Sequence, residues 1–426
     1  MIKNGLLTYI VKYITAVSLL TVLLFVSALI PRSMIYSNIL SSAEYLRSGD
    51  MFAEVWKGVS ASEYDRYADS ILLNIAWNYD SDDLVHSVTE SSYYHSDTQS
   101  ESSNLYDSVT KDPGDNLEYL RYWHGSISLV RSLLMIMPIQ GMYVFLGIVL
   151  LVLFLALIWR LVRMGEKALA VGLSLGMILT YSWFVPFCLE YIWTFLIMFI
   201  VSHLMLKKDM DERRLITILM ISGIVTAYMD FLTTETLTLT IPLIIAVKIR
   251  DKSDDRLTAL KCTVAWGIGY VGMFLIKWLL AAIVLGSDVV TSVITHAEER
   301  TGGLILDEAY FSLLGPIGKN LLTMMPFSLG IVGIAAGCIL IFASVYIGYV
   351  YHGKTVRSKM ILIYVLTAFV PLVRYLALRS HSVAHYFFTF RALMAVILAL
   401  VMVLYEAADI QLILSVRKKN NGKKRR

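Results

Sequence analysis

Long apolar stretches separated by short polar hinges alternate along most of this chain, and a membrane-spanning helix needs about 20 such residues. Stretches near this length lie at 9–31, 142–160, 168–186, 189–206, 215–231, 233–248, 262–286, 325–350, 360–378 and 387–405. Only helices and closed barrels satisfy every backbone polar group inside a bilayer, so the pattern predicts an all-α polytopic membrane protein with about ten transmembrane helices. Hydrophobic residues form 57% of the chain and charged residues 16%, which excludes an ordinary soluble enzyme.

Basic residues gather in alternate hinges, at 160–167, 207–214, 248–261 and 354–359, whereas the hinges near Pro186 and Phe231 contain none. By the positive-inside rule, both termini are cytoplasmic and the segment 32–140 faces outside. The predicted organisation is a first transmembrane helix at 1–31, an outer loop at 32–140 and a transmembrane bundle at 141–405. A second outer loop at 286–320 interrupts the bundle, and a basic cytoplasmic tail at 406–426 follows it.

The polar segment 32–140 has ordered ends and a polar middle. Its middle, 81–115, is rich in Ser, Asp and Tyr and is predicted to be a solvated, partly flexible cover. Near its start, the stretch 63–69 reads Glu-Tyr-Asp-Arg-Tyr-Ala-Asp, in which Asp65 and Asp69 share one helix face because they are four residues apart. Near its end, 126–137 is predicted to be an amphipathic helix at the membrane surface, with Arg131 as its charged residue.

Charges inside or beside the apolar stretches all fall in the half of the span that is predicted to lie outside: Glu190, Asp230, Glu235, Lys277, Arg374 and Arg391. A charge at this depth costs several kcal/mol unless it faces a polar cavity or a partner. The segregation therefore predicts one polar cavity that opens outward. Simpler interpretations are that Glu190 and Glu235 are solvated and that Lys277 and Arg374 extend to headgroups. The three cysteines, Cys188, Cys262 and Cys338, have no metal or redox spacing and are predicted to be core residues.

The chemistry that would need this set is group transfer from a phosphate-bearing lipid. Arginine and lysine at headgroup depth bind a lipid phosphate, and a nearby carboxylate can take a proton from an incoming hydroxyl group. We expect the donor phosphate to be bound by Lys277, Arg374, Arg391 and Arg121. We expect the substrate to contact Tyr67, Trp123, His124, Glu190, Asp230, His381 and His385. An alternative for the 121–124 stretch is an aromatic interface belt, and the i,i+4 spacing of His381 and His385 also suits a metal site.

The chain contains no P-loop and no glycine-rich nucleotide fingerprint, so neither a nucleotide-sugar donor nor ATP is predicted, and no nucleic acid is expected as a partner. The layout resembles the GT-C superfamily of polyprenyl-phosphate-sugar-dependent glycosyltransferases, which includes aminoarabinose transferases and protein O-mannosyltransferases. In that superfamily an acidic motif opens the first outer loop, where this chain has 63–69, and Arg66-Tyr67-Ala68 is similar to the aminoarabinose-transferase motif. Residues 121–125, Glu190-Tyr191, the Asp230 turn and the run 381–391 also resemble a group of integral membrane proteins of Gram-positive bacteria.

The resemblance implies a bacterial cell-membrane enzyme that moves a sugar from a polyprenyl-phosphate donor to an envelope glycan or lipid outside the cell. Asp65 would be the general base, with Glu63 as the alternative, because the family has adjacent Asp-Glu where this chain has Glu63-Tyr64-Asp65. Asp69 would orient the acceptor or hold a divalent metal, whose involvement the sequence leaves open. The competing functions are a transporter or flippase of a lipid-linked or anionic substrate, and an envelope assembly protein without activity.

Overall fold

The computed structural model describes residues 2–252, 254–286, 288–301, 314–350 and 358–408, and within these ranges the fold is helical with no β-sheet. The all-α prediction is therefore confirmed for this part of the chain. Most of the predicted basic tail, from 409 onward, and part of the predicted second outer loop, 302–313, lie outside the described residues.

Among the described residues, six helical stretches are long and apolar enough to cross a membrane, and they indicate a multi-pass membrane protein. They are α1 (Ile2–Ala28), α7 (Ile139–Arg163), α12 (Arg256–Leu285), α16 (Gly330–Val350), α17 (Ser358–Ala377) and the continuous stretch of α19 (Tyr386–Thr389), η4 (Phe390–Leu393) and α20 (Met394–Ala407). The other four predicted spans are the helices α8 (Lys167–Leu179), α9 (Leu189–Met205), α10 (Glu212–Met229) and α11 (Leu237–Arg250). Every residue of α11 is buried, so this short helix is a core element of the bundle.

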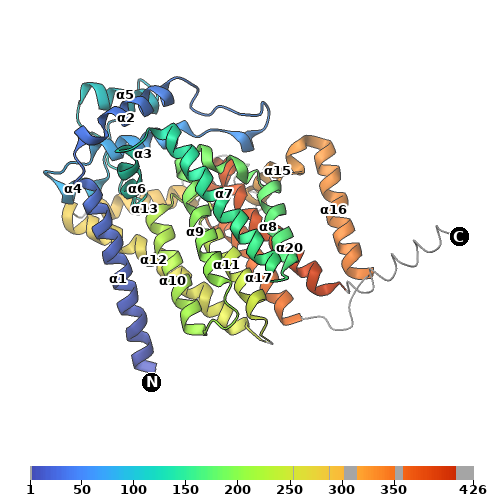
Figure 1. Ribbon diagram of the computed structural model, residues 1–426. Helices are drawn as coiled ribbons and strands as arrows, with labels where there is room; N and C mark the ends of the chain where they lie inside the picture. The colour runs from blue at the N-terminus through green and yellow to red at the C-terminus, as the bar shows by residue number, and fades with distance from the viewer. Residues whose placement is uncertain (1, 253, 287, 302–313, 351–357, 409–426) are drawn as a thin grey trace.

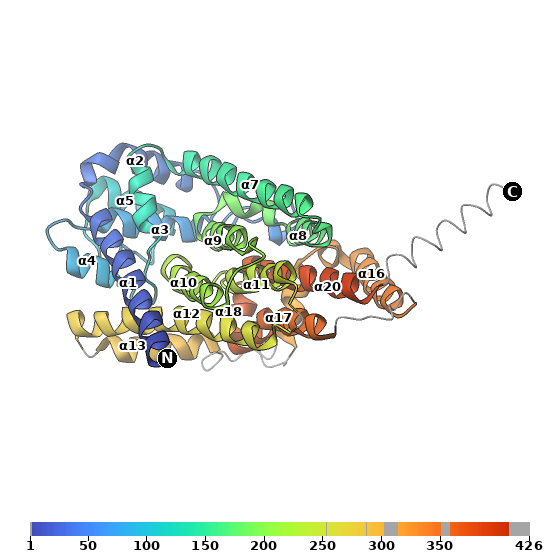
Figure 2. The same ribbon diagram turned by 60° about the horizontal axis from the view of Figure 1, so that its bottom comes forward.

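A separate layer of helices, which we call the cap, covers one end of the bundle (Figures 1 and 2). The cap comprises α2 (Arg32–Arg47), η1 (Ser60–Ser62), α3 (Arg66–Asn78), α4 (Leu84–Glu90), α5 (Glu101–Lys111) and α6 (Ile127–Leu134). The prediction of a solvated, partly flexible loop at 81–115 was wrong, because this region contains α4 and α5. Helix α5 buries Leu105 and Val109 in the main core and packs on α2 and α3.

Close helix approach explains why the bundle is compact beneath the cap. Helices α10 and α12 cross where two glycines face the opposite backbone. A Cβ atom at Gly223 would lie 2.2 Å from the carbonyl oxygen of Trp266, and one at Gly269 would lie 2.3 Å from that of Met220. Small residues at such crossings let helix backbones touch inside a membrane. Substitution at either glycine would therefore force the two helices apart.

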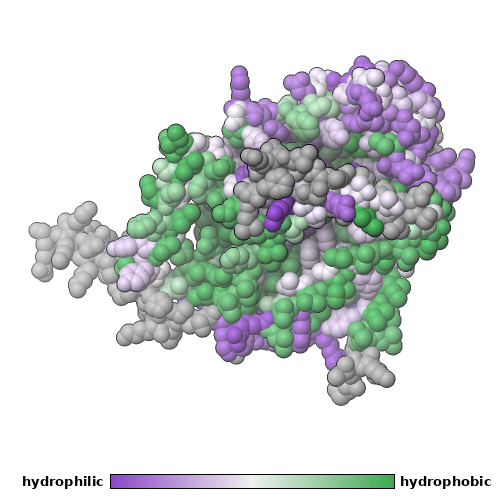
Figure 3. All heavy atoms as spheres, turned by 180° about the vertical axis from the view of Figure 1, so that it is seen from behind, coloured by the Kyte–Doolittle hydropathy of each residue, from purple (hydrophilic) through white to green (hydrophobic). Residues whose placement is uncertain are grey.

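The surface carries a broad apolar band with polar patches beyond it, as expected for a chain that crosses a bilayer (Figure 3). Helix α16 lies at the edge of the bundle and buries only Gly333 and Gly337. Cys338 on this helix is exposed, so its prediction as a core residue was wrong, whereas Cys188 and Cys262 are buried. At the end of the bundle away from the cap, basic residues pair with acids, as in the buried Lys248–Glu406 contact of 2.6 Å.

Candidate functional site

A cavity of about 900 Å³ lies between the cap and the bundle. Its walls come from the cap, from the start of α9, from α13 (Asp288–Thr301) and from α18 (Arg379–Ala384) with the start of α19. The structure brings together here seven residues that the sequence marked as site candidates: Asp65, Tyr67, Arg121, His124, Glu190, His381 and His385. A pocket of this size, with apolar walls and a few convergent polar groups, is the usual form of a ligand site.

Asp65 and Asp69 lie on one side of this cavity and hold the beginning of α9. Asp65 is the N-cap of α3: its Oδ1 accepts a hydrogen bond from the Ala68 amide at 2.9 Å. Its Oδ2 accepts a hydrogen bond from the Tyr191 hydroxyl at 2.7 Å. Asp69, which is fully buried, accepts hydrogen bonds from the Leu189 amide at 2.9 Å and from the Tyr143 hydroxyl. Of these two carboxylates, Asp65 lines the cavity.

Burial perturbs the acid–base properties of the carboxyl groups in this stretch. Burial raises the pKa of Asp65, although the hydrogen bonds from Ala68 and Tyr191 oppose the change. Burial also raises the pKa of Asp69 to about 7, opposed by the Tyr143 hydroxyl and reinforced by the negative charge of Asp65. The pKa of Glu63 is raised to about 7 by burial and by the neighbouring Glu54 and Asp65. Glu63 does not line the described cavity. The lining residue nearest to it in the sequence is Asp65.

Two histidines on another wall are held by arginines. A guanidinium group can only donate hydrogen bonds, so each contacted imidazole nitrogen must be an unprotonated acceptor. Arg374 Nη2 lies 3.2 Å from His381 Nδ1, which leaves the proton of a neutral His381 on Nε2. Arg300 Nη1 lies 3.2 Å from His385 Nε2, which leaves that proton on Nδ1. Burial and the nearby guanidinium groups lower the pKa of His381 well below its ordinary value and that of His385 to about 4.

Arg374 itself is buried and fully engaged. Its Nε donates to Glu235 Oε1 at 2.8 Å, and its other nitrogens donate to the Ser382 hydroxyl and the Leu232 carbonyl oxygen. Arg374 therefore connects α17, the α10–α11 hinge and α18 around His381. It does not belong to the described cavity wall, so the structure separates it from Asp65 and Glu190, the carboxylates that line that wall.

Of the other three predicted phosphate ligands, one lines the cavity and two lie outside its described wall. Arg121 lines the cavity, with its guanidinium carbon 4.8 Å from the centre of the Tyr119 ring. Lys277 Nζ instead donates to the carbonyl oxygens of Val88 and Thr89, at 2.9 and 2.7 Å. Arg391 Nη2 donates to the Ala61 carbonyl oxygen at 2.9 Å, and neither of these two cations contributes to the described cavity wall. Both satisfy buried backbone carbonyl groups that an apolar replacement would leave unpaired.

The predicted substrate-contacting residues also occupy two different environments. Tyr67 is exposed and stacks on Phe52, with ring centres 6.0 Å apart. His124 Nε2 donates to the Tyr119 carbonyl oxygen at 3.1 Å, and burial lowers the pKa of His124 to about 3. Trp123 is buried behind the wall, where its indole nitrogen donates to the Met273 carbonyl oxygen. Asp230 is also buried there and accepts hydrogen bonds from Thr233.

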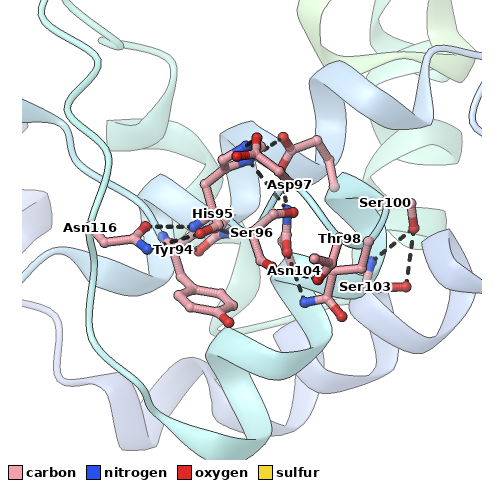
Figure 4. Close-up of polar contacts among 12 residues, drawn as sticks. Tyr94, His95, Ser96, Asp97, Thr98, Ser100, Ser103, Asn104 and Asn116 are labelled. Carbon is pink, nitrogen blue, oxygen red and sulfur yellow. Dashed lines mark hydrogen bonds and ion pairs between the residues drawn. The ribbon is translucent and has the colours of Figure 1, made fainter.

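A polar network in the cap holds another part of the cavity wall (Figure 4). The amide of His95 donates to Asn116 Oδ1 at 2.8 Å, and Asn116 Nδ2 donates back to the His95 carbonyl oxygen at 2.9 Å. The His95 ring contacts Asp97 and Glu101, with Nδ1 2.7 Å from Glu101 Oε1. Burial lowers the pKa of His95, but these carboxylates reverse the effect and leave the pKa raised. The network fixes the strand-like segment that places Asn116, Leu117 and Glu118 against the cavity.

Arg300 is a charged cavity residue that the sequence analysis did not assign. It lies on α13, within the predicted second outer loop at 286–320, and reaches the cavity wall beside His385. In the sequence, Arg300 is one arginine in a segment that also contains Glu298 and other polar residues. No pattern there distinguishes it from an ordinary surface residue. Across the described ranges, no group of three or more His, Cys, Asp or Glu side chains is arranged to hold a metal ion.

Comparison with known proteins does not identify the protein or this site. No family model matches the chain, no curated protein matches it, and no solved structure matches it.

Proposed function

We propose that the protein is a membrane glycosyltransferase that moves a sugar from a polyprenyl-phosphate donor to a cell-envelope acceptor outside a bacterial cell. The proposal includes a GT-C-like arrangement of about ten membrane-crossing helices. Both termini would be cytoplasmic and the cap would face outward. The observation that supports it is the composition of the cavity between the cap and the bundle. Carboxylates and guanidinium groups border the same space, and apolar and aromatic side chains complete its wall.

The charged groups match the two ends of a sugar phosphate. Arg121 and Arg300 border the cavity and can bind phosphate oxygens through charge-assisted hydrogen bonds. Arg374 occupies Nδ1 of His381, so the neutral imidazole carries its N–H group on Nε2. This N–H group can donate a hydrogen bond to an uncharged oxygen. Asp65 and Glu190 border the same cavity, and a carboxylate there can take the proton of an attacking hydroxyl group.

The lipid part of the donor has a compatible surface beside these groups. Helix α3 contributes Ala68, Ile71, Leu72 and Ile75 to the cavity wall, one turn after Asp65. Phe231, Phe387 and Phe388 add aromatic faces. Apolar walls next to a phosphate site suit an isoprenoid chain, and aromatic faces suit the apolar side of a sugar ring. In this proposal Lys277 and Arg391 hold the cap on the bundle, and Arg374 positions His381.

The direct test is incubation of the purified protein with a panel of radiolabelled polyprenyl-phosphate sugars, followed by measurement of donor consumption and donor binding. Arg300→Gln should weaken binding of the consumed donor about ten- to a hundred-fold, the range for loss of a charge-assisted hydrogen bond. Arg379→Gln is the matched control, because Arg379 lies on nearby α18 and is absent from the described cavity wall. Equal donor affinity in both variants would contradict the phosphate role of Arg300. Transport of an intact donor across vesicles without sugar transfer would support the flippase alternative.

A further inference from the structure

The start of α9 is bound on both sides of Glu190 by the two carboxylates of α3. The Leu189 amide donates to Asp69 Oδ1, and the Cys188 thiol also lies 3.6 Å from that oxygen. The Tyr191 hydroxyl donates to Asp65 Oδ2. The residues before and after Glu190 are thus fixed to α3, and Glu190 itself is the position in this turn that faces the cavity.

The carboxylates of Asp65 and Glu190 differ in how they can react. Each oxygen of Asp65 already accepts a hydrogen bond, and only 4% of this residue is exposed. Glu190 is half-buried, lines the cavity, and forms no hydrogen bond or ion pair through its carboxylate with any described residue. A general base must reach the proton that it accepts, and Glu190 meets this requirement better than Asp65.

Charges of both signs surround Glu190. It interacts electrostatically with Asp65 and Asp69 of α3, with Asp230 at the end of α10 and with the Arg300 guanidinium group on α13, and Arg121 lines the same cavity. Arg300, which also contacts His385, is the cation that interacts with this carboxylate and that we assign to the donor phosphate.

We infer that Glu190 is the proton acceptor of the transfer reaction, and that Asp65 and Asp69 are positioning residues that hold its helix turn. The inference rests on the proposed function. In the reaction, an oxygen of the acceptor hydroxyl group forms a bond to the anomeric carbon of the donor sugar. The bond between that carbon and the phosphate oxygen breaks, and its electron pair stays on the phosphate, which Arg121 and Arg300 stabilise. The hydroxyl proton passes to the Glu190 carboxylate, so no oxidant, reductant or further reactant is needed.

The test compares Glu190→Gln, Asp65→Asn and the exposed-surface control Glu44→Gln in donor affinity, in single-turnover rate and in the dependence of that rate on pH. Glu190→Gln should lower the rate by about 10²–10⁴-fold, the usual effect of removing a general base, without weakening donor binding. It should also remove the decline of the rate at acidic pH. Asp65→Asn should lower the rate less than about tenfold and keep that decline, because the asparagine oxygen can accept the Ala68 hydrogen bond and its NH2 group can donate to the Tyr191 hydroxyl oxygen. In Glu190→Ala, added formate or azide should restore part of the lost rate.

Two results would overturn the inference while leaving the proposed function in place. One is a Glu190→Gln protein with wild-type turnover. The other is a normal acidic decline in Glu190→Gln together with its loss in Asp65→Asn, which would return the base role to Asp65. Failure of the wild-type protein to consume any donor in the panel would instead overturn the proposed function. A folded, donor-binding Glu190→Gln protein with a strongly lowered rate, together with a Glu190→Ala protein that formate restores, would support both.

Discussion

Asp69→Asn should change how the stability of the folded protein depends on pH. Asp69 is fully buried in α3 and its pKa is raised from 3.8 to about 7, mainly by burial. Between these two values the folded protein binds a proton that the unfolded chain releases. Stability therefore falls as the pH rises through this window. The asparagine side chain has the same shape, can still accept the Leu189 hydrogen bond and does not ionise.

The size of the effect follows from the two pKa values. Their difference corresponds to about 4 kcal/mol of unfolding free energy over the whole window, at about 1.4 kcal/mol per pKa unit. About 3 kcal/mol of this falls between pH 5 and pH 8. We therefore expect the stability of Asp69→Asn, relative to wild type, to be higher at pH 8 than at pH 5 by an amount of this order. Asp65 and Glu63 titrate in the same direction in both proteins, so the comparison isolates Asp69.

The assay is reversible unfolding in mixed micelles with a denaturing detergent, followed by tryptophan fluorescence at a series of pH values. Asp50→Asn is the control, because Asp50 is an exposed carboxylate of the cap. A constant difference between Asp69→Asn and wild type from pH 5 to pH 8 would refute the reasoning, since it would mean that Asp69 ionises in the folded protein without cost.

Three further outcomes are expected from other parts of the molecule. His381→Gln should keep more donor turnover than His381→Leu, because glutamine retains an N–H donor near the Nε2 position; equal loss in the two variants would contradict the donor role. Lys277→Met should lower the unfolding free energy by about 1–3 kcal/mol, because it leaves the Val88 and Thr89 carbonyl groups unpaired, and should leave donor affinity unchanged; a selective loss of affinity would return Lys277 to the phosphate site. On a Cys338→Ser background, a membrane-impermeant thiol reagent applied outside cells should label Thr98→Cys and not Lys208→Cys; the reverse pattern would invert the proposed topology.

The sequence predicted the helical class and the positions of the helices because long apolar runs have few other stable forms. It also placed Asp65 and Asp69 close together, and they are the N-cap and a first-turn residue of α3. These predictions succeeded because they depend on local periodicity. The cap was harder to predict: the many Ser and Asp residues at 81–115 suggested a loop, whereas α4 and α5 are held by capping side chains such as Asp83 and Ser100.

The sequence could not show which basic residues line the cavity and which are buried in the interior. Lys277, Arg374 and Arg391 were predicted to be phosphate ligands only because of their expected depth in the membrane. Their partners are carbonyl groups and a carboxylate that are distant in the chain, for example Val88 for Lys277 and Ala61 for Arg391. Such pairings depend on how the cap sits on the bundle, which no periodicity encodes. Arg300 was missed for the same reason, since its place beside His385 depends on the path of α13.

The buried cations that join the cap to the bundle also constrain how the protein is made. The cap is synthesised directly after α1, and Arg131, from its own α6, donates to the carbonyl oxygens of Ser27 and Ala76 early in this order. The carbonyl groups of Thr89 and Ala61 accept hydrogen bonds from Lys277 and Arg391, which the ribosome adds far later. The cap, although synthesised early, is therefore among the last parts of the protein to complete its contacts. During the interval its unpaired carbonyl groups and the open cavity are accessible to chaperones and proteases, so a chain truncated before α12 should be degraded from the cap inward.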